Sequence, residues 1–191
     1  MYDNPEKYQK LKDKKYLVIP NFISQEEVTW YLDYFNRYVE QFKIGNDSMV
    51  ENCSSKYNFV PFVQLLCYKT EIVSSIVGAN LLPTYAFGRT YYKNSDLKKH
   101  KDRPACEVSL SVHLEGDKEW NLFIEGCPVT LNKGDAVLYW GYDDEHWRDK
   151  YEGEKYTNVF LHYVRTFGPF CNHVFDIKNY APKTKKHFLS T

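Results

Sequence analysis

The residues best suited to chemistry in this sequence are His100 and Asp102, which are separated by one lysine. Side chains of an extended backbone alternate between two faces, so an imidazole and a carboxylate two positions apart lie on the same side. With a second histidine from elsewhere in the chain, the pair would complete the set of two histidines and one carboxylate that binds non-haem Fe(II) and leaves coordination positions open. The sequence therefore suggests an iron site.

A second pair of the same type, His113 and Glu115, lies in the strand-like segment CEVSLSVHLEG. A histidine two positions before an acidic residue is a weak motif, because about one match is expected by chance in a chain of this composition. Alternation places His113 on the polar face of the segment with Ser109 and Ser111, where it would line a cavity or contact solvent. The surrounding sequence has to decide between the two pairs.

The third ligand would come from His146 or His162. His146 lies 44 residues after Asp102, in the segment GDAVLYWGYDDEHWRD, beyond a short apolar run typical of a buried strand. His162 lies in VFLHYV, where alternation puts it on the same face as Phe160 and an ordinary packed histidine is equally consistent. We expect His146 to complete the site.

Lys155 and Thr157 follow nine and eleven residues after His146, in the next expected strand. Their spacing puts an ammonium and a hydroxyl on one face, and this combination suits a carboxylate because a charged donor forms the stronger hydrogen bond. Arg148 and Arg165 flank the region and offer alternatives for the same role. A metal site and a carboxylate clamp together would make one coherent site.

The elements before the site are expected to support it. A strand is expected over 16–20, and a helix should start at Ser24, because serine followed three residues later by Glu27 forms a capping box. Apolar residues then recur at helical spacing, at Val28, Tyr31, Leu32, Phe35, Tyr38, Val39 and Phe42. The polar segment 45–58 is expected to be an exposed loop, and a second helix is expected over 61–77, closed by Gly78.

From Leu81 onward the sequence is rich in aromatic and β-branched residues, with breaks at Gly, Asn, Asp or Pro. This pattern predicts short strands over 84–93, 106–114, 120–124, 136–140 and 156–164. Because the strands follow the helices without alternating with them, the pattern argues against a doubly wound fold. The predicted class is α+β with a mainly β core.

The composition fits one globular domain, with 191 residues of which 43% are hydrophobic and 17% aromatic. We divide it into a strand and helical support (1–80), a β core (81–166) and a C-terminal tail (167–191). The 25 basic and 25 acidic residues balance, so no net charge favours nucleic acid or an anionic membrane. The charged N-terminal segment is unlike a signal peptide, and five cysteines without a C-x-x-C pair suggest reduced thiols, so a cytoplasmic protein without a membrane partner is expected.

These motifs together resemble the Fe(II)- and 2-oxoglutarate-dependent dioxygenases, and most of all their prolyl-hydroxylase-like branch. The resemblance rests on His-x-Asp, a distal histidine, and a basic residue about ten positions later with a hydroxyl two residues on. It extends over most of the chain, through the blocks YLVIPNFIS, RTYYKNSDLKKHKDRPACEVSLSVHL, GDAVLYWGYDDEHWRD and EGEKYTNVFLHYV. Such blocks in this order are more specific than the short motif.

The resemblance implies a double-stranded β-helix, a jelly-roll or cupin-like arrangement, with Fe(II) held by His100, Asp102 and His146 rather than by the His113 pair. It also implies that Lys155 holds the distal carboxylate of 2-oxoglutarate, with help from Thr157. Tyr91, nine residues before His100, would assist them. The implied reaction converts 2-oxoglutarate and O2 to succinate and CO2 while a substrate C–H bond is hydroxylated, with ascorbate as a suitable reductant.

Two features depart from the family pattern. Many members carry arginine at the position of Lys155, and a loop glycine common before the ligand pair is replaced by Asn94-Ser95-Asp96. Both departures bear on how the keto acid is held.

The resemblance implies a peptidyl-proline hydroxylase, with a protein or peptide as substrate. The alternatives are an oxygenase acting on a free amino acid or another small molecule, a metalloprotein without 2-oxoglutarate, and a non-catalytic β-helix that serves as a binding module. Four residues near the ligands are candidate substrate contacts, although tryptophans are more often core and arginines more often surface: Arg103, Arg148, Tyr92 and Trp140.

Overall fold

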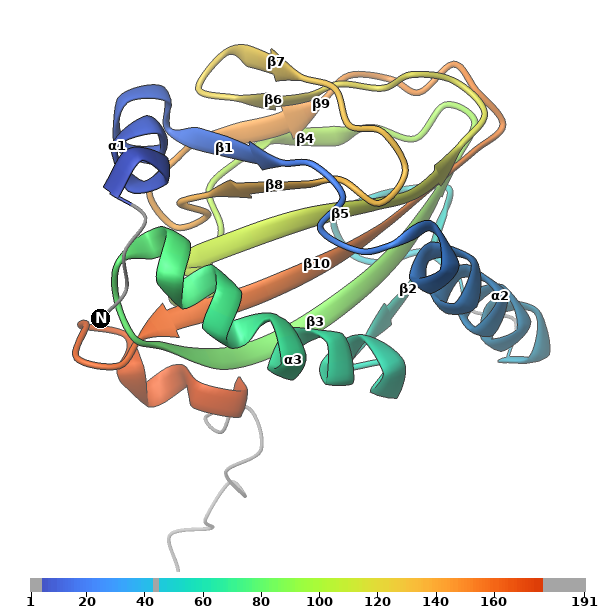
Figure 1. The fold of residues 1–191 in the computed structure, drawn as a ribbon. Helices are drawn as coiled ribbons and strands as arrows, with labels where there is room; N and C mark the ends of the chain where they lie inside the picture. Colours follow the sequence, from blue (N-terminus) through green and yellow to red (C-terminus); the bar gives the residue numbers. More distant parts are fainter. Residues whose placement is uncertain (1–4, 43–44, 177–191) are drawn as a thin grey trace, which may run out of the picture.

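The computed structural model describes residues 5–42 and 45–176, which form two antiparallel sheets flanked by helices (Figure 1). The six-stranded sheet has the order β1 (Tyr16–Ile19), β8 (Ala136–Tyr139), β5 (Val108–Gly116), β10 (Lys155–Arg165), β3 (Leu81–Tyr92) and β2 (Cys53–Tyr57). The four-stranded sheet has the order β4 (Leu97–His100), β9 (His146–Arg148), β6 (Leu122–Ile124) and β7 (Cys127–Val129). The sheets face each other as in a double-stranded β-helix, which confirms the predicted α+β class with a mainly β core.

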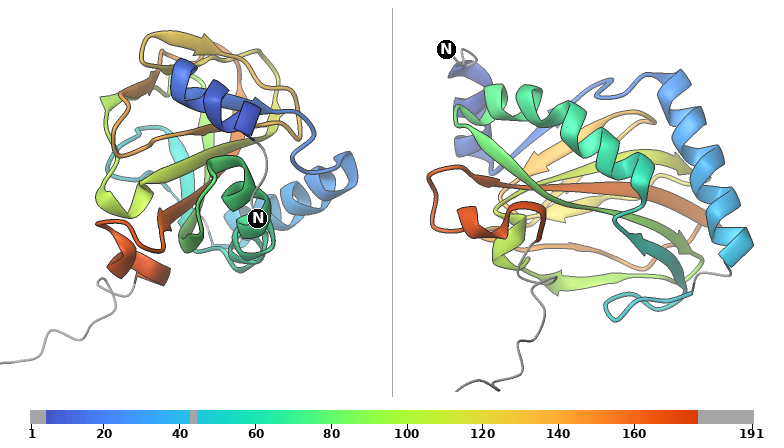
Figure 2. Two further views of the ribbon diagram at one scale, coloured as in Figure 1. Left: turned by 60° about the vertical axis from the view of Figure 1, so that its left-hand side comes forward. Right: turned by 90° about the horizontal axis from the view of Figure 1, so that it is seen from below.

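Three α-helices alternate with β1 and β2 before the chain enters β3: α1 (Pro5–Lys14), α2 (Gln25–Phe42) and α3 (Val60–Val77). The predicted capping box is present at the start of α2, where the Glu27 backbone N–H donates to Ser24 Oγ at 3.1 Å and the Ser24 N–H donates to Glu27 Oε2 at 2.7 Å. Gly78 closes α3 in a left-handed conformation, as expected. Both longer helices lie against the outer face of the six-stranded sheet (Figure 2).

The strands at the centre of this sheet have two different faces. Val108, Leu110, Val112 and Leu114 of β5, with Val159 and Leu161 of β10, pack under the helices in the main hydrophobic core. The alternate residues point toward the small sheet, because strand side chains change face at every position. The inner face therefore carries polar and aromatic side chains around a cavity.

α3 is long and apolar enough to be compared with a membrane span, at 18 residues. In this structure its apolar residues Phe62, Leu65 and Leu66 lie fully buried in the main core. This packing is what a core helix of a globular domain shows.

The structure corrects the prediction that 45–58 is entirely a loop, because its second half forms β2. This strand pairs with the edge of β3, and its sequence CSSKY has no alternation of apolar residues that would indicate a strand. Six further elements lie outside the predicted set: α1, β4, β7, β9 and two 3-10 helices, Pro104–Cys106 and Cys171–Asp176. Residues 177–191 of the predicted tail lie outside the described residues.

Candidate metal centre

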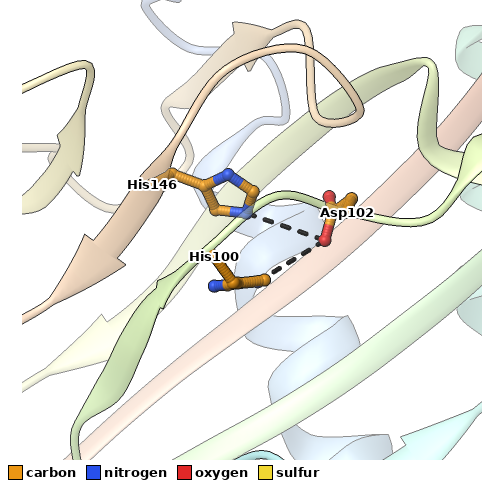
Figure 3. Close-up of side chains that lie close together, drawn as sticks. All are labelled: His100, Asp102 and His146. Atoms are coloured by element: carbon orange, nitrogen blue, oxygen red, sulfur yellow. Dashed lines mark ion pairs between the residues drawn. The ribbon is translucent and has the colours of Figure 1, made fainter.

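The pairing of β4 with β9 brings the two predicted histidine ligands together. His100, the last residue of β4, is the antiparallel partner of His146, the first residue of β9, and their ring centroids are 4.3 Å apart (Figure 3). Asp102 follows β4 and is held by its backbone N–H, which donates to the carbonyl of Gly141 at 2.8 Å. Its Oδ1 lies 3.5 Å from Nε2 of His100 and 3.7 Å from Nε2 of His146.

Both imidazoles are oriented by backbone carbonyls. Nδ1 of His100 lies 2.8 Å from the carbonyl oxygen of Lys98, and Nδ1 of His146 lies 3.0 Å from that of Asp144. A carbonyl only accepts, so each Nδ1 carries a hydrogen, which leaves Nε2 of each ring as the nitrogen available to a metal on the side of Asp102. One ligand atom from each of the three side chains lies within 4.8 Å of the others. A single divalent cation at about 2.1 Å from each atom fits this arrangement.

The carboxylate of Asp102 is held in its ionised form. Burial by itself would raise its pKa, but the facing imidazoles of His100 and His146 outweigh burial and hold the pKa of Asp102 well below its usual range. Its second oxygen, Oδ2, accepts a hydrogen bond from Ser109 Oγ at 3.3 Å, which leaves Oδ1 facing the histidines. An ionised carboxylate with one free oxygen and two neutral imidazoles is the donor set that Fe(II) takes in non-haem oxygenases.

Gly141 allows the close approach of this carboxylate. A Cβ at that position would lie 2.6 Å from Oδ2 of Asp102 and 2.7 Å from the carbonyl oxygen of Cys106, and it would also meet Ser109 Oγ. No side chain fits in that space, so a glycine is required beside the metal site.

A cavity of about 240 Å³ opens beside the three residues. Its lining comes from both sheets and from the segment before β2: Asp47, Ser48, Met49, Tyr57, Tyr85, Phe87, Arg89, Leu97, His100, Asp102, Arg103, Leu122, Tyr139, His146, Phe160 and His162. The ring of Tyr85 stacks on that of Tyr57 at 4.8 Å and lies tilted against the imidazole of His162 at 4.4 Å, measured between ring centroids. The site therefore has aromatic walls with the three candidate ligands at one side.

Lys155 and Thr157 do not reach this cavity. Lys155 Nζ lies 2.6 Å from Glu115 Oε1 and 2.9 Å from Asn36 Oδ1 of α2, and Thr157 Oγ1 lies 3.0 Å from Thr90 Oγ1. The two residues share a face of β10 as predicted, but that face is turned toward the helices. Their position does not support the predicted carboxylate clamp, and the positive charge of Lys155 is already paired with the carboxylate of Glu115.

Tyr91 and Tyr92 point to opposite sides of β3. Tyr91 is fully buried, with its hydroxyl 3.1 Å from Nη1 of Arg89 and its ring against Trp120 at 4.9 Å. The hydroxyl of Tyr92 lies 3.1 Å from Ser54 Oγ, away from the cavity. Neither tyrosine lines the cavity wall.

The other predicted contacts are divided between the cavity and the rest of the fold. Arg103 lines the cavity, where its guanidinium lies over the ring of Tyr85 at 4.4 Å and pairs with Asp176 at 2.6 Å. Trp140 packs against the main core under the helices. Arg165 pairs with Glu107 at 2.6 Å.

The rival pair is not assembled. A bulge opposite Thr157 and Asn158 places Glu115 beside Lys155, whereas His113 stacks on Tyr156 on the inner face, with ring centroids 4.3 Å apart. His113 and Glu115 therefore do not face a common ligand.

His162, weighed as the third ligand, lines the same cavity beside the metal site. Its Nδ1 lies 2.9 Å from Ser109 Oγ, and burial lowers its pKa to about 4, so it is neutral. With Asp102 and Cys106 it forms a second group of potential ligand atoms within 4.8 Å of one another. Cys106 Sγ is 3.0 Å from the hydroxyl of Tyr85.

Sequence reasoning missed Arg89 and Asp47, which line the cavity as an ion pair of 2.7 Å. Alternation along β3 could have placed Arg89 on the same face as Tyr91, but nothing local indicates that Asp47, 42 residues earlier, lies beside it.

No protein-family model matches the sequence, and no curated protein matches it either. Solved structures do match. A Pseudomonas putida prolyl-4-hydroxylase superposes with a TM-score of 0.67 at 12% identity, over 86% of this chain and 99% of that chain. HygX from Streptomyces hygroscopicus, with nickel and 2-oxoglutarate bound, superposes with a TM-score of 0.68 at 13% identity, over 86% and 88% of the two chains.

A prolyl hydroxylase from Trichoplax adhaerens, in complex with a hypoxia inducible factor peptide, superposes with a TM-score of 0.64 at 12% identity, over 82% of this chain and 86% of that chain. HygX has also been solved with nickel, 2-oxoglutarate and hygromycin B, and that structure superposes with a TM-score of 0.69 at 14% identity, over 86% and 88% of the two chains. Similarity at these identities establishes the fold. The chain has the double-stranded β-helix fold of the 2-oxoglutarate- and Fe(II)-dependent oxygenases, with a candidate His-Asp-His metal site.

Proposed function

We propose that the protein is an Fe(II)- and 2-oxoglutarate-dependent dioxygenase that hydroxylates a substrate C–H bond. The observation that carries this proposal is the convergence of Nε2 of His100, Oδ1 of Asp102 and Nε2 of His146 beside one cavity. The presence of nickel and 2-oxoglutarate in HygX, which has the same fold, supports it.

Each residue of the site has a defined part in this function. His100, Asp102 and His146 would hold the metal, and the carbonyls of Lys98 and Asp144 keep the two imidazoles in the metal-binding tautomer. When bound, Fe(II) with 2-oxoglutarate and O2 supplies the oxidising chemistry, and the keto acid leaves as succinate and CO2.

The cavity walls would position the substrate and exclude water. Tyr57, Tyr85, Phe87 and Phe160 give them an aromatic surface. Such a surface suits an uncharged, mostly apolar group placed against the metal site.

We propose a peptidyl proline as the substrate group. The two arginines in the cavity wall are already paired, Arg89 with Asp47 and Arg103 with Asp176. A free amino acid would need partners for both its charges, whereas a proline ring within a peptide is neutral and fits an aromatic wall. The prolyl hydroxylases among the structures of similar fold support this choice.

A small-molecule substrate is the second candidate, and the structure of HygX with hygromycin B favours it. The test supplies Fe(II), 2-oxoglutarate and ascorbate, and measures succinate and hydroxylated product with proline-containing peptides, free amino acids and amino sugars. Product from peptides alone supports peptidyl-proline hydroxylation, and product from the other groups alone supports the second candidate. A protein that forms no succinate under any condition would be a binding module rather than an oxygenase.

A further inference from the structure

Arg148 is a buried cation that lacks an anionic partner. Its side chain is 2% exposed, and among the described residues no carboxylate forms an ion pair with it. The other four arginines of the chain each pair with a carboxylate: Arg37 with Asp33, Arg89 with Asp47, Arg103 with Asp176, and Arg165 with Glu107. Arg148 is the exception, although it is among the most deeply buried.

Neutral groups hold the guanidinium in place but do not supply acceptors for all of its N–H donors. It lies between two aromatic rings, 4.7 Å from the centroid of Trp120 and 4.9 Å from that of Tyr156. Nη1 donates to the carbonyl of Trp120 at 2.7 Å, and the Asn158 amide, in the orientation that satisfies its own partners, accepts from Nη2 at 3.0 Å. Nε is buried and has no hydrogen-bond partner.

A buried charge in this condition indicates an anionic ligand. A guanidinium group stays protonated in proteins, so the free-energy cost of burying its charge cannot be relieved by loss of a proton. A buried ion without a partner of opposite charge therefore destabilises the folded state. Five N–H donors in a planar fork are suited to a carboxylate, which accepts two parallel hydrogen bonds.

The location of Arg148 fits a ligand that also reaches the metal site. It is two residues after His146 on β9, so both side chains point to the inner face, and their Cα atoms are about 6.6 Å apart along an extended strand. On one side, Arg148 pairs with Leu97 of β4. On the other side, Trp147 pairs with Phe123 of β6, so in this antiparallel pair Arg148 lies beside Leu122. Leu97 and Leu122 both line the cavity, so its wall includes the residues on either side of Arg148, while Arg148 itself is not part of that lining.

We propose that Arg148 binds the distal carboxylate of 2-oxoglutarate, in place of the lysine on β10 that the sequence resemblance implies. The proposal rests on the proposed function. The five-carbon keto acid would bind the metal through its keto-acid end and direct its other carboxylate along β9 to the guanidinium. Lys155, on the opposite face of the sheet and paired with Glu115, serves the contact between β10 and α2 instead.

The test compares two keto acids that differ only at the distal end. Protein loaded with Mn(II), which does not turn over, is titrated by calorimetry with 2-oxoglutarate and with 2-oxopentanoate, which has a methyl group in place of the distal carboxylate. The variants are Arg148→Gln and, as a matched control, Lys155→Gln. Loss of one partner from a buried charged pair is expected to weaken binding by about 30-fold or more.

The wild type is therefore expected to prefer 2-oxoglutarate by about 30-fold or more, and Arg148→Gln is expected to lose that preference while its affinity for 2-oxopentanoate stays within about 3-fold. Lys155→Gln should retain the preference. A preference that survives Arg148→Gln, or is lost in Lys155→Gln, contradicts the proposal. If the wild type binds neither acid in a metal-dependent manner, the proposed function itself fails.

A second measurement uses the unmodified protein, so it does not depend on the variant folding. A crystal structure with Mn(II) and 2-oxoglutarate is expected to show the distal carboxylate within hydrogen-bond distance of the Arg148 guanidinium. A carboxylate bound to Arg89 or Arg103 would overturn the assignment.

Discussion

His100 and His146 are direct partners in the antiparallel pair of β4 and β9, with their imidazole centroids 4.3 Å apart. The 45 residues between them in the sequence include β5, β6, β7 and β8, after which the chain places His146 beside His100. The metal site is therefore a property of sheet pairing, and it forms only when the small sheet is complete.

Removal of any of the three candidate ligands should abolish tight metal binding. We expect His100→Ala, Asp102→Ala and His146→Ala each to lower Mn(II) affinity by about 100-fold or more, because changes to groups that merely support ligands already cost 10 to 100-fold. Calorimetric titration with Mn(II) measures the effect. His113→Ala is the control and should bind as the wild type does; weak binding by that variant and normal binding by His100→Ala would reverse the assignment.

Ser109→Ala should weaken the metal site without removing a ligand. The variant loses the hydrogen bond to Oδ2 of Asp102, so the carboxylate is free to turn, and we expect Mn(II) affinity to fall about 10-fold. Ser111→Ala is the matched control on the same strand face, because Ser111 contacts Asn158 at 2.6 Å instead of Asp102. Equal effects of the two substitutions would show that Ser109 acts only through packing.

Gly141→Ala should displace Asp102. The added methyl group would lie 2.6 Å from Oδ2 of Asp102 and 2.7 Å from the carbonyl oxygen of Cys106, so one of these segments must move. We expect a loss of stability of about 1 to 3 kcal/mol, as for other overpacked sites, together with weaker metal binding. Gly45→Ala, at a position with nothing within 4 Å, is the control in thermal unfolding and metal titration. A Gly141→Ala protein with unchanged metal affinity would contradict the described position of the carboxylate.

Two buried histidines should make the protein less stable in mild acid. Burial, reinforced by the charge of Arg148, lowers the pKa of His113 to about 4, and burial lowers that of His162 to about 4. The unfolded chain, with histidine pKa values near 6.5, binds more protons between these limits, so the free energy of unfolding falls as pH drops from about 6.5 to 4 and levels off below. Each histidine contributes on the order of 3 kcal/mol.

Urea unfolding of the metal-free protein across this range measures the effect, and His113→Gln should reduce the fall by roughly half. Burial raises the pKa of Asp144 to about 6, which has the opposite effect on stability between pH 4 and 6. The difference between wild type and His113→Gln isolates the histidine, because Asp144 is present in both. Parallel pH profiles for the two proteins would show that His113 is not held neutral.

The sequence predicts most of the framework because its signals are local. The capping box of Ser24 and Glu27 and the glycine at position 78 are fixed by contacts within a few residues, and the structure has both. β2 escapes prediction because its polar sequence has no alternation of apolar residues, and its partners on β3 are 30 to 38 positions away.

The cofactor side of the site is harder to predict. Alternation shows that Lys155 and Thr157 share a face, but β10 is buried on both faces almost throughout, so its pattern does not reveal which face meets the cavity. The bulge in the pairing of β5 with β10 separates His113 from Glu115, and no sequence signal marks it. The ion pair of Arg89 and Asp47 is a long-range contact, visible only in the folded chain.

The central claim is that one cation is bound by His100, Asp102 and His146, and anomalous scattering from crystals soaked with Mn(II) tests it most directly. We predict a single strong peak at about 2.1 to 2.3 Å from Nε2 of both histidines and from Oδ1 of Asp102. A peak beside Cys106 and His162, the other group of potential ligands near Asp102, or no peak in the cavity, would contradict the account.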